Sequence, residues 1–129
     1  MFTADDIKQT HSKVKSGADF PNYIQDLIKL GIKNYETFVM DGHAVFFGEG
    51  DYTVQLDAKY PPKSIAENSD AENFKNYLKT HQAGQTDYLT FCSHCAETGI
   101  EKWKVDLAAM TCTYYDLSGR EILTERIPG

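Results

Sequence analysis

The spacing of apolar residues predicts two helices at the start of the chain. Thr3 and Asp6 have the spacing of a capping box, and apolar residues then recur at helical intervals until Gly17. Asp19 can cap a second helix, whose wide apolar stripe ends at Gly31. Because a stripe of that width has to be buried, the second helix is expected to pack against another element.

A second pair of helices is predicted later in the chain. Ser69 and Glu72 repeat the capping box, and Gly84 ends the helix that they begin. A fourth helix is expected from Asp87 to Thr98. The helices therefore occur as two pairs, each followed by residues of a different pattern.

After each helix pair the apolar residues alternate, as is typical of strands. Asp41 and Gly42 form a two-residue turn signal, which predicts a hairpin with Thr37 opposite Phe46. That register puts Tyr35, Thr37, Val39, Ala44 and Phe46 on one face, and Phe38, Val45 and Phe47 on the other. Further strands are predicted over residues 52–56, 102–110, 111–116 and 121–127.

The two halves of the chain resemble each other. When 68 is subtracted from each residue number, Asp87, Gly99, Ile100 and Trp103 fall on Asp19, Gly31, Ile32 and Tyr35. The unit of helix, helix and three strands is thus predicted twice, as repeats 3–56 and 69–127. Residues 57–68 join the repeats, and Pro61 and Pro62 keep this loop out of a helix or sheet.

These elements predict one domain of 129 residues with an α+β fold. We expect about six mostly antiparallel strands, built from a duplicated α-α-β-β-β unit, with the four helices packed mainly on one face. The strand order and the number of sheets are left open by the sequence.

Charge and composition narrow the possible partners. The 13 basic and 19 acidic residues give a net charge of −6, and the lysines alternate with acids along the chain. An acidic surface repels a phosphate backbone, so nucleic-acid binding is not expected. No apolar run reaches the length of a membrane span and the first residues lack the pattern of a signal peptide, so we expect a cytoplasmic protein without a membrane partner.

Cys92, His94 and Cys95 form the motif with the clearest chemical potential, because thiolates and imidazole are preferred zinc ligands. The repeat points instead to packing: Cys92 and Cys95 fall on Ile24 and Leu27, in the apolar stripe of the second helix. Two further ligands with metal spacing are also lacking. We therefore expect no metal, no cofactor and reduced thiols, and keep a thiol- or metal-dependent function as the alternative.

Motifs of catalysis are not recognisable. The histidines are scattered, the serines lie in predicted helices, caps and turns, and the glycine-rich residues 48–51 link two strands rather than a strand and a helix. We expect the protein not to be an enzyme, and a small-molecule enzyme with a site between the repeats would need a pocket with convergent acids.

The face of the sheet opposite the helices is the candidate interaction surface. It should carry Phe38, Val45, Phe47, Thr113 and Tyr115. If it is bare, an apolar surface of this kind indicates a protein partner, a ligand groove or a homodimer. The alternative is that residues 57–68 or 126–129 fold across it.

The segments GADFPNYIQDL, SDAENFKNYLKTHQAGQTDY and GIEKWKVDLAAMTCTYYDLSG resemble a small bacterial and prophage-borne family of unknown function, the YbcV-like proteins. Its members are frequently labelled as phage envelope proteins. The resemblance covers nearly the whole chain but implies no catalytic residue and no cofactor. Together with the residues, it predicts a non-enzymatic binding module whose partner is another protein or a second copy of the chain.

Overall fold

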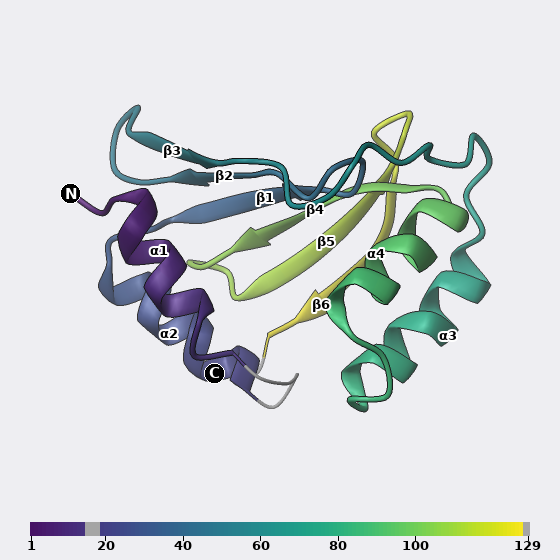
Figure 1. The fold of residues 1–129 in the computed structure, drawn as a ribbon, viewed down its shortest axis with the longest axis horizontal. Helices are drawn as coiled ribbons and strands as arrows, with labels where there is room; N and C mark the ends of the chain where they lie inside the picture. Colours follow the sequence, from purple (N-terminus) through teal and green to yellow (C-terminus); the bar gives the residue numbers. More distant parts are fainter. Residues whose placement is uncertain (15–18, 128–129) are drawn as a thin grey trace.

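The computed structural model describes residues 1–14 and 19–127, which form a six-stranded antiparallel sheet and four helices. All four helices lie on the same face of the sheet (Figure 1), so the predicted α+β fold is confirmed. The helices are α1 (Ala4–His11), α2 (Phe20–Lys29), α3 (Ala71–Gln82) and α4 (Tyr88–Glu97). The strands are β1 (Asn34–Phe38), β2 (Ala44–Phe47), β3 (Thr53–Leu56), β4 (Ile100–Asp106), β5 (Thr111–Asp116) and β6 (Glu121–Arg126).

Side-chain caps begin three of the helices. The capping box of Thr3 and Asp6 at α1 is formed as predicted, and Asp87 caps α4 by accepting a hydrogen bond from the Thr90 amide. These caps satisfy amide groups that the first turn of a helix leaves without a partner. The predicted end of the first helix at Gly17 lies outside the described residues.

The predicted cap of the third helix was wrong by one residue. Asp70, not Ser69, is the N-cap of α3, and its carboxylate accepts hydrogen bonds from the amide and the side chain of Asn73. A carboxylate at this position also interacts favourably with the positive end of the helix dipole. The Ser69 hydroxyl instead accepts a hydrogen bond from Arg120 at 3.3 Å.

The first hairpin has the predicted faces but not the predicted register. Thr37 lies opposite Ala44 rather than Phe46, a shift of two residues. The cause is Val39, which is fully buried and whose amide donates to the Glu101 carbonyl of β4 at 2.9 Å instead of pairing with β2. Because side chains alternate with a period of two, this shift leaves every side chain on its predicted face.

The two halves of the sheet meet at β1 and β4. The strand order is β3-β2-β1-β4-β5-β6, and Glu36 lies opposite Lys104, its counterpart 68 positions later. On either side of this pair, Asn34 lies opposite Asp106 and Phe38 opposite Lys102, which are equivalent pairs under exchange of the halves. The sheet therefore has an approximate two-fold axis through the Glu36–Lys104 pair. Origin by duplication stays a prediction, with which this pairing agrees.

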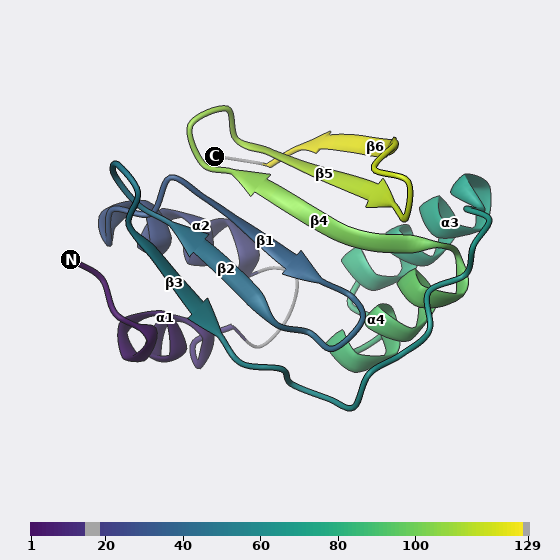
Figure 2. The ribbon, with the colours of Figure 1, turned by 90° about the horizontal axis from the view of Figure 1, so that it is seen from above.

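The core lies between the sheet and the helices. Ile24 and Leu27 of α2 and Phe74 of α3 are fully buried there. Helices α1 and α2 pack together beneath one part of the sheet, and α3 and α4 pack together beneath another (Figure 2). A single apolar core thus spans both repeats.

The segment that joins β3 to α3 runs around the border of the sheet. The amides of Lys59 and Lys63 donate to the carbonyls of Asp41 and Met40 at the tip of the first hairpin. The segment then reaches α4, where the Ala66 amide donates to the Ala96 carbonyl. It does not cross the face opposite the helices (Figure 2), so the alternative in which residues 57–68 fold across that face was wrong.

The tips of the two hairpins differ in a way that follows from what lies over them. Gly42 has a φ of 77°, and a Cβ there would meet the ring of Tyr60 at 2.8 Å. Met110, its counterpart in the second hairpin, has a φ of 57° and is the one non-glycine residue with positive φ in the described parts of the chain. Only the Tyr60-covered tip requires the absence of a side chain, so a longer residue is tolerated at the other tip at a cost of about 1 kcal/mol.

Replacing Gly99 is expected to test how closely the second repeat is packed against the joining segment. Gly99→Ala should lower the free energy of unfolding by roughly 2–4 kcal/mol, because a Cβ would lie 2.7 Å from the Ser69 Cα, in addition to the strain of a φ of 83°. Gly84→Ala is the matched control, since its φ is 78° but no atom lies within 4 Å. It should cost about 1 kcal/mol. Equal losses in urea unfolding of the two variants would contradict the close approach.

Candidate functional site

The face of the sheet that points away from the helices, called the outer face below, is built by strand alternation. Its strand residues are half-buried or exposed, whereas their neighbours along β1, β2 and β5 are buried. The cross-strand pairs place these side chains on it: Asn34, Glu36, Phe38, Val45, Phe47, Thr53, Gln55, Lys102, Lys104, Asp106, Thr111, Thr113, Tyr115, Glu121, Thr124 and Arg126. No described helix or loop lies over it (Figure 2).

The five residues proposed from the sequence lie on this face as two separate groups. Phe38, Val45 and Phe47 come from β1 and β2, which are neighbours. Thr113 and Tyr115 come from β5, and β4 lies between the groups. The charged strip that results at the centre of the face was not predicted from the sequence. The alignment of Glu36 with Lys104 in the two repeats was a signal that could have found it.

Lys102 connects the two groups. Its Nζ lies 2.9 Å from Oε1 of Glu36, 5.6 Å from the ring centre of Phe38 and 5.7 Å from that of Tyr115. Phe38 in turn stacks on His43, with ring centres 4.4 Å apart. Each cation–ring contact contributes roughly 0.5–1 kcal/mol at a partly exposed site. These contacts hold the ammonium group of Lys102 against the face instead of leaving it free in solvent.

An arrangement of this kind is suited to contact with another macromolecule. Aromatic side chains supply apolar area, and fixed charges between them supply direction and register. The central groups of the face are a lysine that is paired with a glutamate and two aromatic rings. What it offers is a broad surface on one rigid sheet.

The cysteine motif of α4 points to two sides of the helix. Cys92 and Cys95 are fully buried in the core, whereas the His94 ring stacks on Tyr77 of α3 with ring centres 3.8 Å apart. Residues three apart share a helix face, while the residue between them points elsewhere. Within residues 1–14 and 19–127, no group of three or more His, Cys, Asp and Glu side chains is placed to hold an ion.

The environment of the thiols favours their protonated form. Burial raises the pKa of Cys95 well above its usual value and that of Cys112 to about 12. Burial also raises the pKa of Cys92, although the nearby hydroxyls of Tyr60 and Tyr88 oppose this shift. Since the thiolate is the nucleophile and the metal ligand, buried neutral thiols are poor candidates for either role.

Each histidine lies with its own local partners. His11 contacts the hydroxyl of Tyr23 through Nε2, and its pKa is lowered to about 4, chiefly by burial. His43 Nδ1 lies 2.5 Å from Asp41, and His81 Nδ1 lies 3.1 Å from the Thr86 carbonyl. This distribution agrees with the scattered histidines of the sequence and does not assemble a catalytic set.

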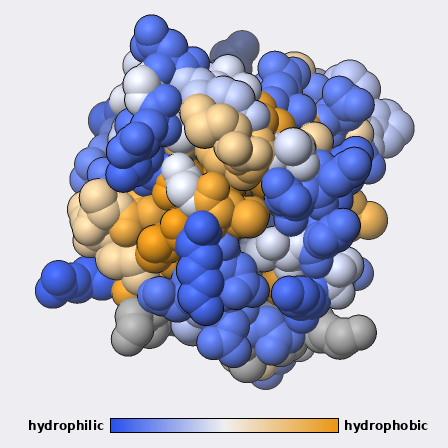
Figure 3. Space-filling model, turned by 90° about the vertical axis from the view of Figure 1, so that its left-hand side faces the viewer, coloured by the Kyte–Doolittle hydropathy of each residue, from blue (hydrophilic) through white to orange (hydrophobic). Residues whose placement is uncertain are grey.

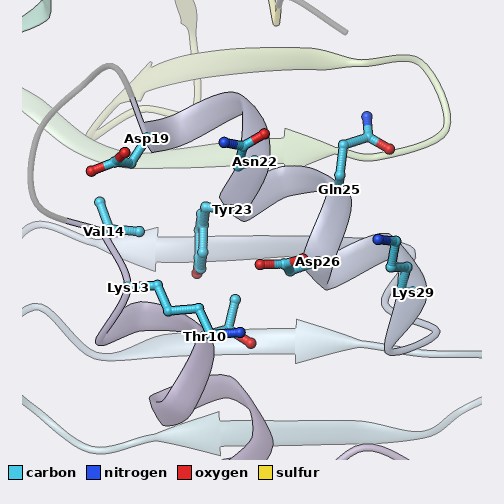
Figure 4. Close-up of a pocket in the computed structure, with 9 residues that line it drawn as sticks. All are labelled: Thr10, Lys13, Val14, Asp19, Asn22, Tyr23, Gln25, Asp26 and Lys29. Carbon is cyan, nitrogen blue, oxygen red and sulfur yellow. The ribbon is translucent and has the colours of Figure 1, made fainter.

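A hollow of about 370 Å³ lies between α1 and α2 (Figure 4). Figure 4 shows the Tyr23 ring between the two helices, with Lys13 and Val14 on one side and Asp19 and Asn22 on the other. The hollow belongs to the first repeat and not to the seam between the repeats, where the enzyme hypothesis had placed a site. Its lining mixes lysine, aspartate and amide side chains at an open surface.

A second apolar area lies at the end of the molecule that carries α1, α2 and the β4–β5 turn (Figure 3). The side chains that these elements leave exposed include Ile28, which is 39% exposed, Ala108 and Ala109. Met110 packs partly against the core beside them. The area is confined to a helix end and a hairpin tip, whereas the outer face extends over six strands.

Together these features define an α+β protein whose sheet is covered on one side, with a mixed aromatic and charged face on the other. None of the helices in the described residues is long and apolar enough to cross a membrane. The model of a family of proteins of unknown function, DUF1398, matches residues 8–126, so the chain belongs to that family. This confirms the predicted membership of an uncharacterised family. A search of curated proteins gave no match.

Thiol reactivity tests the environment of the cysteines. The three thiols should react with a disulfide reagent only as fast as the protein unfolds, because they are buried and protonated at neutral pH. The reaction is followed at pH 7 in buffer and in denaturing urea, where all three should react at once. A thiol that reacts rapidly in the folded protein, or zinc that purifies with it in a stoichiometric amount, would contradict this assignment.

His11 should make the stability of the folded protein depend on pH. Its folded pKa of about 4 lies below the value near 6.5 of the unfolded chain, so the unfolded state takes up a proton first as the pH falls. Stability is then complete above about pH 6.5 and declines by at most about 1.4 kcal/mol per pH unit down to the folded pKa. Urea midpoints at pH 7.5 and 5 should show the decline, and His11→Gln should reduce it. An identical decline in the variant would exclude His11 as its source.

Proposed function

We propose that this protein is a non-enzymatic binding module that contacts a protein partner through its outer face. The observation that supports the proposal is a six-stranded face that no described helix or loop covers, although Phe38, Val45, Phe47 and Tyr115 lie on it. Each of these apolar side chains is half-buried, and apolar side chains gathered on an uncovered face are typical of interaction sites. The charged strip between the aromatic groups supplies the specificity that apolar contacts lack.

The composition of the outer face favours a surface that binds a partner over a surface that only contacts solvent. A sheet with one solvated face normally alternates apolar inward residues with polar outward residues. Here β2 is apolar on both faces, since the outward Val45 and Phe47 alternate with the buried Ala44 and Phe46. Strand propensity favours such residues at any strand position, but it does not account for the placement of Lys102 between two aromatic rings.

The alternative, a thiol- or metal-dependent protein using Cys92 and Cys95, has weaker support. Both sulfur atoms are in the core and His94 points toward α3. Three buried, unpaired cysteines are in keeping with a reducing compartment, so we propose a cytoplasmic location. A bacterial or prophage origin, with the label of a phage envelope protein, belongs to this proposal through the resemblance of the chain to YbcV-like proteins.

Site-specific photocrosslinking in the 129-residue chain tests the outer face. A photoreactive phenylalanine derivative at Val45 should give protein adducts in cells that express the chain, because that position lies in the proposed contact surface. Lys75 is the matched control, since it is exposed on α3 and away from the sheet. Adducts at Val45 should be at least about tenfold more abundant than adducts at Lys75.

The adduct masses separate two kinds of partner. Adducts of any protein at Val45, whether with another chain or with a second copy, support the binding module. Equal or absent adducts at both positions would overturn it. Circular dichroism and urea unfolding of both labelled proteins confirm that each is folded before the comparison is made.

A further inference from the structure

We propose that the partner on the outer face is a second copy of this chain, packed face to face in a two-fold dimer. This inference rests on the proposed function, because it assigns an occupant to the same surface. It further specifies the geometry: the dimer axis runs parallel to the strands, above the β1–β4 pair. The first half of one outer face, from β1 to β3, then lies over the second half, from β4 to β6, of the other copy.

The charge of the outer face is the first observation. Three acidic and three basic strand residues lie on it: Glu36, Asp106, Glu121, Lys102, Lys104 and Arg126. They cancel, whereas the whole chain carries −6. The excess negative charge therefore belongs to the rest of the molecule. Two copies that meet through another surface bring like charge together, but through this face they do not.

The distribution of these charges is the second observation. Glu36 belongs to the first half of the face, and Lys102 and Lys104 belong to the second half. An axis parallel to the strands places Glu36 of each copy toward Lys104 of the other. An axis across the strands would instead place Glu36 against Glu36. Because like charges directly opposed are unfavourable, the first arrangement is selected.

The apolar groups fit the same arrangement. Val45 of one copy would lie over Thr113 of the other, and Phe47 over Thr111, since β2 and β5 are equally distant from the β1–β4 pair and the cross-strand pairs put these residues level with each other. Each contact occurs twice in an isologous dimer. Aligned packing of two sheets, with strands within about 30° of each other, allows both apolar groups to be covered at the same time.

The dimensions of the face predict a weak dimer. Six strands spaced about 4.8 Å apart, with some five residues each at about 3.3 Å, give a footprint of roughly 500 Å². A standard stable interface covers about 800 Å² on each partner. The dimer should thus dissociate on dilution, with a dissociation constant on the order of 10–100 μM, and the charge contacts should contribute a substantial part of its stability.

A charge exchange between two variants of the 129-residue chain tests the dimer by sedimentation velocity over about 1–500 μM. In a dimer of Glu36→Lys, a lysine at position 36 of each copy faces Lys104 of the other. In a dimer of Lys104→Glu, a glutamate at position 104 faces Glu36, so each variant alone should weaken association at least about tenfold. Mixed in equal amounts, the two variants should restore it, because each contact then pairs Lys with Glu. Lys75→Glu on α3 is the control for net charge and should leave association unchanged.

Thr113→Arg gives a second test that leaves the ion pairs intact. It places a long side chain at a half-buried position of the face and should abolish dimerisation, while circular dichroism confirms the fold. A wild-type chain that stays monomeric to about 500 μM, or a mixture that fails to recover association, would overturn the proposed dimer. Photocrosslinks at Val45 to other proteins, without an adduct of twice the chain mass, would also overturn it while leaving the binding module in place.

Discussion

The pairing of β1 with β4 is the interaction on which this structure depends. It joins two three-stranded units into one sheet and centres the sheet on the Glu36–Lys104 pair. Without it, each unit would be a short meander with one helix pair, too small to bury a sizeable core. With it, one apolar core spans both repeats, and all the helices are on one side.

The same pairing creates the outer face. Because β4 inserts Lys102 and Lys104 beside β1, the aromatic residues of the two repeats are kept apart by a charged strip. The contacts of Lys102 with Glu36, Phe38 and Tyr115 then tie residues of both repeats together. One backbone pairing thereby determines both the stability of the sheet and the chemistry of the surface that we propose for binding.

Features set by local chemistry could be predicted from the sequence. The capping box of Thr3, the cap at Asp87 and the inward and outward faces of β1 and β2 all follow from residues close together in the chain. The burial of Cys92 and Cys95 could also be predicted, because the first repeat has aliphatic residues at those positions. Periodicity and local hydrogen bonding are sufficient for such features.

Features set by distant contacts could not be predicted. The hairpin register depends on Val39, which bonds to Glu101 in the other repeat, so the local turn signal of Asp41 and Gly42 was misleading. The strand order depends on the β1–β4 pairing, which has no local signal. The five residues of the candidate site could be predicted to share one face. That β4 divides them into two groups could not be predicted, because it follows from the strand order.

Methyl NMR provides the most direct measurement of whether the outer face is a contact surface. Methyl-labelled protein is compared at increasing concentration, with Val45 and Thr113 as reporters on the outer face and Ala108 and Ala109 as reporters on the other apolar area. If the outer face is the contact surface, the resonances of Val45 and Thr113 shift with concentration while those of the two alanines stay fixed. Shifts confined to Ala108 and Ala109 would contradict it, as would unchanged resonances throughout the accessible range.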